Sequence, residues 1–271
     1  MVKILVDLSI LKRDLLFEIR EKIVNNKTQP LNEYFDSNYK IEINAIKNLL
    51  DTIEQRLRNC EIIYYTYFEN IDHTSLNGAT MTTPKIIDIQ YAYGTSVVKN
   101  RVQINDSIAY IDIITREFRL FILHLSTLYE NISRLTEILI KKIIIHHKKN
   151  KPLSSPHHIL VDHWEILMNL SYRDSDNCYN CISLHRAFLD EYAGIINLLR
   201  NIYMHGYTSN LYPDGADYKI SNLTNNFTQG SPKLTVDVFV NHVLQNTKQL
   251  VTDFIGALIS DMKIPGQTIP M

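Results

Sequence analysis

A long, regularly spaced run of apolar residues decides the fold class of this chain. Residues 107–142 read SIAYIDIITREFRLFILHLSTLYENISRLTEILIKK, with apolar side chains recurring every three or four positions. This spacing places those side chains along one side of an α-helix. Asp106 or Ser107 can cap the start of the helix, and Pro152 stops it. We therefore predict a helix from about residue 106 to residue 149.

Further helices are expected on both sides of this segment. Apolar residues recur at helical spacing in five other segments: 3–25, 41–58, 159–170, 179–205 and 234–262. Segment 62–68 is aromatic and β-branched, which favours a strand, although a buried helix fits it almost as well. Residues 86–104 are ambiguous. Clusters of Gly, Pro, Ser and Asn predict loops at 73–84, 152–158 and 209–232.

The order of these elements predicts a mainly α-helical protein. Only eight glycines and eight prolines punctuate 271 residues, which favours long elements. The helices of the C-terminal half would bury their apolar sides best in an antiparallel helical bundle. We expect a mostly helical N-terminal extension of unknown role at residues 1–106, the bundle at 107–262 and a tail at 263–271.

The composition limits the classes of function. Apolar residues make up 45% of the chain and charged residues 21%, which is typical of a globular protein with a full core. The formal net charge of −1 argues against nucleic-acid binding by the whole surface, so any such site must be a local patch. The three cysteines do not make a disulfide framework. Without an apolar run of about 18 residues or a signal-peptide pattern, we expect no membrane span and a cytoplasmic location.

The strongest functional signal lies at the end of the helix predicted over 179–205, where residues 200–205 read RNIYMH. Asn201 and His205 are four positions apart and share a helix face, and Arg200 lies about 100° around the helix. A histidine can transfer protons near neutral pH, a guanidinium binds phosphate oxygens, and an amide can orient either group. Because the 2′-hydroxyl of RNA supplies a nucleophile, this set suits phosphodiester cleavage without a metal.

The order Arg, polar residue, three variable residues, His resembles the signature of the HEPN superfamily of helical ribonucleases. The resemblance covers roughly residues 107–262 and leaves residues 1–106 unexplained. It implies a metal-independent endoribonuclease that needs no cofactor and is usually a homodimer, with two motifs meeting in one cleft. It also implies a toxin or phage-defence effector, which an antitoxin or another regulatory protein could restrain.

The same resemblance implies roles for individual residues. His205 would be the general base, Arg200 would steady the phosphate, and Asn201 would orient His205. The expected product carries a 2′,3′-cyclic phosphate. Many family members also have a polar residue on an earlier helix facing the motif, and Glu130 and Asn131 both fit that place.

Two other patterns have a functional and a structural interpretation. Cys178, Cys181 and His185 have the spacing of metal ligands, but a zinc site usually has four ligands and a second cysteine pair is missing. We therefore favour a structural role for these cysteines. The basic run Lys141–Lys151 suits an RNA backbone, and it equally suits a solvated helix C-terminus, where cations are favourable.

Two alternatives to the ribonuclease hypothesis remain open. One is a catalytically silent HEPN-type module that binds RNA, a nucleotide or a protein partner. The other is a helical scaffold with no nucleic-acid role. An arginine and a histidine are favourable at any helix C-terminus, so the motif alone does not separate these functions.

Overall fold

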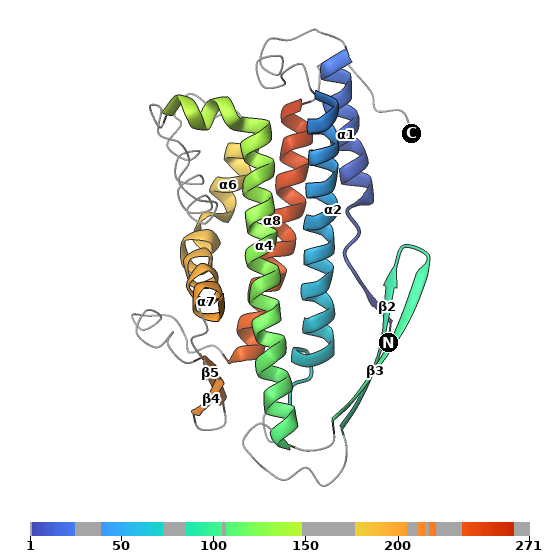
Figure 1. The fold of residues 1–271 in the computed structure, drawn as a ribbon, viewed down its shortest axis with the longest axis vertical. Helices are drawn as coiled ribbons and strands as arrows, with labels where there is room; N and C mark the ends of the chain where they lie inside the picture. Colours follow the sequence, from blue (N-terminus) through green and yellow to red (C-terminus); the bar gives the residue numbers. More distant parts are fainter. Residues whose placement is uncertain are drawn as a thin grey trace. The chain divides into compact units, whose positions relative to one another are not determined.

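The protein is mainly α-helical and carries a small three-stranded sheet (Figure 1). The computed structural model describes residues 2–24, 39–72, 85–104, 107–147, 177–204, 211–214, 217–220 and 235–262. The α-helices of these residues are α1 (Ser9–Val24), α2 (Tyr39–Ile63), α4 (Ser107–His147), α6 (Asn177–Phe188), α7 (Gly194–Met204) and α8 (Val236–Met262). Two π-helical segments continue α2 and α6, namely η1 (Tyr64–Phe68) and η3 (Leu189–Ala193). The strands are β1 (Val2–Ile4), β2 (Lys85–Tyr93), β3 (Ser96–Ile104), β4 (Leu211–Asp214) and β5 (Asp217–Ile220).

Helix α4 confirms the prediction from the apolar run. Its fully buried side chains follow the three- and four-residue spacing of the sequence: Ile114, Phe118, Phe121, Ile122, Leu125 and Leu128. Segments 41–58 and 234–262 are helical as well, in α2 and α8. The short helix predicted over 159–170, the loops predicted at 73–84 and 152–158, and the tail at 263–271 lie outside the described residues.

The described helices contribute to two compact units. Unit 1 comprises Met1–Val6, Arg56–Ser126 and Ile195–Asn246, and unit 2 comprises Asp7–Gln55, Thr127–Gly194 and Thr247–Met271. Helices α2, α4 and α8 each supply residues to both units. Each unit also combines segments from both sides of residue 106, the boundary predicted from the sequence.

In unit 1, aromatic side chains join four helical elements. The Phe118 ring of α4 lies 6.4 Å from Phe68 of η1, 6.1 Å from Phe239 of α8 and 6.5 Å from Tyr203 of α7, between ring centroids. The thiol of Cys60 in α2 donates to the Phe121 carbonyl of α4 at 3.9 Å. Such tilted and edge-to-face ring contacts stabilise a core beyond simple burial.

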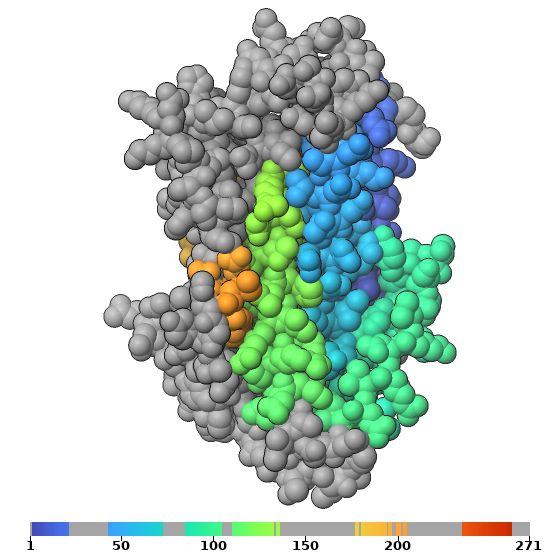
Figure 2. Space-filling view, in the orientation of Figure 1, coloured from blue at the N-terminus to red at the C-terminus, as the bar shows by residue number. Residues whose placement is uncertain are grey.

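The sheet of unit 1 has the strand order β1-β2-β3. Strand β1 runs parallel to β2, and β2 and β3 form an antiparallel hairpin. The turn of the hairpin contains Gly94 at a φ of 54°, a left-handed conformation that favours glycine. On one face Tyr91 is buried, and its hydroxyl shares a short hydrogen bond with Thr66 of η1. Figure 2 shows the β2–β3 hairpin at the surface, where Val97 and Val98 are 57% and 60% exposed.

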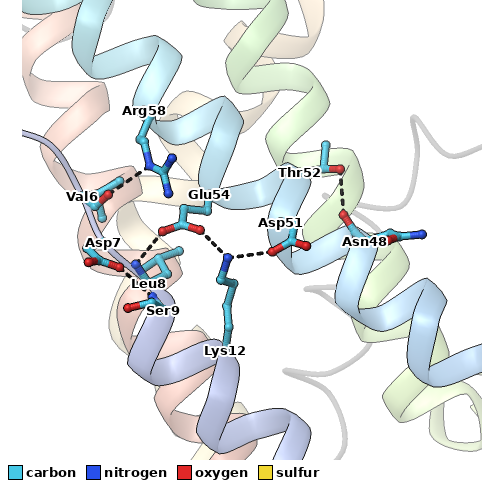
Figure 3. A network of polar contacts seen from close by, with 10 residues as sticks. All are labelled: Val6, Asp7, Leu8, Ser9, Lys12, Asn48, Asp51, Thr52, Glu54 and Arg58. Carbon is cyan, nitrogen blue, oxygen red and sulfur yellow. Dashed lines mark hydrogen bonds and ion pairs between the residues drawn. The ribbon is translucent and has the colours of Figure 1, made fainter. Parts of the chain in front are cut away.

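In unit 2, polar contacts connect α1 to α2 and α4 to α8. The Glu54 carboxylate of α2 accepts hydrogen bonds from the backbone amide of Leu8 and from Lys12, at the start of α1 (Figure 3). Tyr129 of α4 and Thr247 of α8 share a buried hydrogen bond of 2.6 Å. The same unit contains apolar side chains that are nearly inaccessible to solvent: Leu15, Ile19, Ile46, Leu50 and Leu250.

Two expectations for the first 70 residues need correction or completion. The helix predicted over 3–25 starts only at Ser9, because Val2–Ile4 pairs as a strand with β2 and the Asp7 carboxylate accepts a hydrogen bond from the Ser9 amide. β-branched residues fit a strand once a partner strand is present. The strand favoured over 62–68 is wrong, since α2 runs to Ile63 and η1 follows. There the Glu69 amide donates to the Tyr64 carbonyl, a π-helical bond.

Three later segments also differ from the expectations. The ambiguous residues 86–104 form the β2–β3 hairpin. The loop predicted over 209–232 is wrong at Leu211–Asp214 and Asp217–Ile220, which form the antiparallel strands β4 and β5. The single helix predicted over 179–205 is divided into α6, η3 and α7.

Candidate functional site

The predicted motif lies at the end of α7 in unit 1. Ile196 and Leu199 bury their side chains and hold the helix against its unit, while Arg200 and Asn201 are half-buried. The described part of the helix ends at Met204. His205, the predicted general base, therefore lies outside the described residues, and its role stays a prediction.

Arg200 and Asn201 are in contact. Nη1 of Arg200 donates to Oδ1 of Asn201 at 3.4 Å, at the long end of the hydrogen-bond range. A guanidinium carries five N–H donors, and this contact uses one of them. The contact thus limits the directions in which the Arg200 guanidinium can point.

Tyr203, inside the motif, connects α7 to α4. Its ring meets the Phe118 ring edge-on, at 6.5 Å and 90°. The guanidinium of Arg119 lies over the same tyrosine, with Cζ 5.6 Å from the ring centroid. A planar cation over an aromatic face is an attractive arrangement. These two neighbours on α4 hold the last described turn of α7 in place.

Arg119 is the residue of this region that the sequence did not single out. Phe118 was expected in the core from its helical spacing, and Arg119 follows it directly. Nothing local distinguishes Arg119 from Arg116, which forms an ion pair of 2.7 Å with the adjacent Glu117. The pairing of Arg119 with Tyr203, 84 positions later in the sequence, is a property of the tertiary structure alone.

The two supporting residues suggested by the resemblance belong to unit 2, whereas Arg200 and Asn201 belong to unit 1. Nη2 of Arg134, one helical turn away, donates to Oε1 of Glu130 and forms an ion pair with it at 2.7 Å. Asn131 is 7% exposed, and its amide nitrogen has no hydrogen-bond partner among the described residues. That either of them faces the motif stays a prediction.

The cysteine pair adopts an arrangement suited to a structural role. Cys178 and Cys181 are buried in α6, and burial followed by the charge of Asp253 raises the pKa of Cys181 to about 12. His185 Nε2 lies 2.9 Å from Asp253, and the Asp261 carboxylate accepts the backbone amide of Cys178. In the part of the chain that the structure describes, no group of three or more His, Cys, Asp or Glu side chains could hold a metal ion.

Two further features bear on nucleic-acid and membrane binding. The helical backbone of α4 extends to His147, but the side chains of the basic run Lys141–Lys151 lie outside those the structure describes. Contact of that run with RNA therefore stays a prediction. None of the described helices combines the length and the apolar character needed to cross a membrane.

Comparison with known proteins adds no relative. No protein-family model, no curated protein and no solved structure matches this chain. The function of the chain can therefore be inferred only from its own residues and from the contacts that they make.

Proposed function

We propose that the chain is a metal-independent endoribonuclease of the HEPN type. The observation that supports this proposal most directly is the contact between Arg200 and Asn201 in the last described turn of α7. The mainly helical fold is consistent with a HEPN-like antiparallel bundle. The net charge of −1 agrees with a local RNA site rather than a basic surface.

The proposed chemistry uses the RNA strand itself as the nucleophile. His205 removes the proton from a 2′-hydroxyl, and the resulting oxyanion attacks the adjacent phosphorus. The P–O5′ bond breaks, the 5′-oxygen takes a proton from water as it leaves, and a 2′,3′-cyclic phosphate forms. Arg200 stabilises the negative charge of the pentacoordinate phosphate, since a guanidinium binds two phosphate oxygens at once. Asn201 limits the orientation of Arg200 and, in the proposal, that of His205.

The wider proposal concerns assembly and biological role. Two copies of the α7 end, one from each protomer of a homodimer, would form one cleft around the RNA. Uncontrolled RNA cleavage is harmful to a cell, so a toxin or defence effector held in check by an antitoxin is the role that fits such an activity.

Cleavage of RNA in EDTA by the purified full-length chain tests the proposal. Wild-type protein should produce fragments with 2′,3′-cyclic phosphate ends and leave DNA of the same sequence intact. His205→Ala should lower the rate by about 10²–10⁴-fold, as expected for a lost general base. Arg200→Ala should lower it by about 10²–10³-fold. Arg186→Ala, which removes an arginine from an exposed ion pair with Asp190, is the matched control and should remain active.

The outcomes discriminate between the alternatives. Cleavage that requires a divalent metal, or that survives both motif substitutions, would overturn the proposal. A protein that binds RNA without cutting it would be a silent binding module, and one that does neither would be a scaffold. Growth arrest on expression, relieved by His205→Ala, would support the toxin role, whereas arrest by the variant as well would contradict it.

A further inference from the structure

We propose that strand β3 (Ser96–Ile104) binds an extended acidic segment of another protein, which adds to the sheet as a fourth strand antiparallel to β3. The strand order β1-β2-β3 leaves β3 with a neighbour on one side only, among the residues that the structure describes. An edge strand of this kind is a template for a further strand. The inference goes beyond the proposed nuclease activity and does not depend on it.

One hydrogen bond in the sheet indicates which backbone groups of β3 face outward. The Leu5 amide donates to the Ala92 carbonyl at 3.0 Å, so the backbone groups of Ala92 point to the β1 side of β2. Ala92 is opposite Val97, and bonded and non-bonded pairs alternate along an antiparallel ladder. The backbone groups of Val97 therefore point away from β2, and the same alternation applies to Lys99 and Arg101. These three residues offer amide donors and carbonyl acceptors to a fourth strand.

This stretch of β3 is open to solvent. Val97 and Val98 are 57% and 60% exposed, and the side chain of Arg101 is 68% exposed. Lys99, between them, is exposed as well. The β2–β3 hairpin lies at the surface in Figure 2. A partner can therefore approach the strand from solvent.

The charge of β3 favours an acidic occupant. The strand carries Lys99 and Arg101 and no acidic residue. Lys99 is opposite the uncharged Gln90 of β2. Arg101 Nε lies 3.6 Å from Oδ1 of Asp88, but both side chains are mostly exposed and such ion pairs are weak. Opposite charges on directly opposed residues of neighbouring strands attract, so carboxylates on a fourth strand would stabilise it beside these two cations.

The alternation of side chains along β3 defines the sequence that it would accept. Val97, Lys99 and Arg101 share one face of the sheet, because successive residues of a strand point to opposite faces. Val98 and Asn100 lie on the other face. An antiparallel partner passes Arg101 first and Val97 last. From its N-terminus it should therefore read acidic, polar, acidic, apolar, apolar.

A second copy of β3 fits this edge less well. Two copies related by a two-fold axis normal to the sheet would pair antiparallel. The register that pairs the whole strand sets Lys99 opposite Arg101 of the second copy. A shift by two residues in either direction sets Lys99 opposite Lys99, or Arg101 opposite Arg101. Like charges directly opposite each other are destabilising, so the two cations oppose self-pairing of this edge.

Peptide binding to the full-length chain tests the inference. The probe is a fluorescein-labelled peptide with the order Glu-Thr-Glu-Val-Val between flanking serines, and fluorescence anisotropy measures its affinity. A second peptide carries lysine in place of glutamate. A third carries N-methyl groups on the amides that would face β3, which cannot donate hydrogen bonds there. The wild-type chain should prefer the first peptide to both others, and this peptide should slow hydrogen exchange in residues 96–104.

Variants of the chain separate charge from backbone pairing. Lys99→Glu should weaken binding of the acidic peptide about tenfold, because attraction becomes repulsion. Lys47→Glu reverses an exposed charge on α2 and is the matched control, with binding near that of the wild type. Val97→Pro removes one outward amide, leaves the bonds to β2 in place and should weaken binding about fivefold. Val97→Thr keeps that amide and should bind normally. Melting temperatures check that every variant is folded.

Four results would overturn the inference. The first is equal affinity of the wild-type chain for the acidic and the lysine peptide. The second is normal binding of the acidic peptide by folded Val97→Pro and Lys99→Glu proteins, or equal weakening by Lys47→Glu and Lys99→Glu. A dimer in sedimentation that Val97→Pro dissociates would make a second copy the occupant. Binding of single-stranded RNA that Lys99→Glu abolishes, without peptide binding, would assign the two cations to nucleic acid.

Discussion

Removal of the Glu54 carboxylate should destabilise unit 2 strongly. Glu54 is 3% exposed and accepts the Leu8 backbone amide at 2.9 Å and the Lys12 ammonium, both at the start of α1 (Figure 3). A carboxylate at a helix N-terminus satisfies a free amide and interacts favourably with the helix dipole. Asp51 contacts the same Lys12 at 2.7 Å, but its side chain is 49% exposed.

The expected loss follows from these contacts. Loss of the acceptor for the Leu8 amide costs about 1 kcal/mol, as for a helix cap. Breaking a buried ion pair costs about 3 kcal/mol at the lower end of the usual range. We use this lower value because Lys12 still forms its ion pair with Asp51 when Glu54 is replaced. Glu54→Ala should therefore lower the free energy of unfolding by about 4 kcal/mol. Asp51→Ala, the matched control, should cost about 0.5 kcal/mol because its ion pair is exposed to solvent.

Urea unfolding of the full-length chain, followed by circular dichroism, measures these differences. Glu54→Gln should fall between the two variants, since an amide oxygen can still accept the Leu8 amide but lacks the charge. Equal losses of unfolding free energy for Glu54→Ala and Asp51→Ala would refute the reasoning. The buried pair with Glu54 and the exposed pair with Asp51 would then contribute equally to stability.

The same network has a defined dependence on pH. Burial alone would lower the pKa of Lys12, but the hydrogen bonds to Asp51 and Glu54 outweigh it and raise the pKa above 10.5. Folded Lys12 thus holds its proton more tightly than unfolded Lys12. Its contribution to stability is complete below about pH 10.5 and declines as the pH rises through the raised pKa. In the Glu54→Gln variant, stability should therefore decrease less as the pH rises.

Three further results are expected. Burial and the charge of Arg56, whose Nη1 donates to His124 at 2.9 Å, lower the pKa of His124 below 6.5. The unfolded chain then takes up the proton first, so the melting temperature should fall as the pH drops below about 6.5; an equal fall in His124→Gln would contradict this. Tyr129→Phe removes the buried bond to Thr247 and should cost about 1 kcal/mol in urea. Adding Thr247→Val should cost little more, and fully additive losses would count against the bond. All three cysteines are buried, so a thiol reagent should react with them only after unfolding, and rapid labelling of the native chain would be the contrary result.

The sequence by itself determined the helical class of the protein. The apolar spacing in α2, α4 and α8 depends on residues three and four positions apart, so it is readable locally. The sequence also predicted that Arg200 and Asn201 lie on a helix, and α7 contains both residues.

Only the tertiary structure decided the elements and contacts whose partners are distant in sequence. Val2–Ile4 becomes a strand because β2, more than 80 residues later, supplies its hydrogen-bond partners. Segment 62–68 is aromatic and β-branched like a strand, yet it continues α2 because Thr66 and Phe68 are buried within unit 1. Arg119 looks like any solvated arginine until α7 brings Tyr203 beneath it. Local preferences of about 1 kcal/mol cannot settle such cases, because burial and pairing with distant residues contribute more.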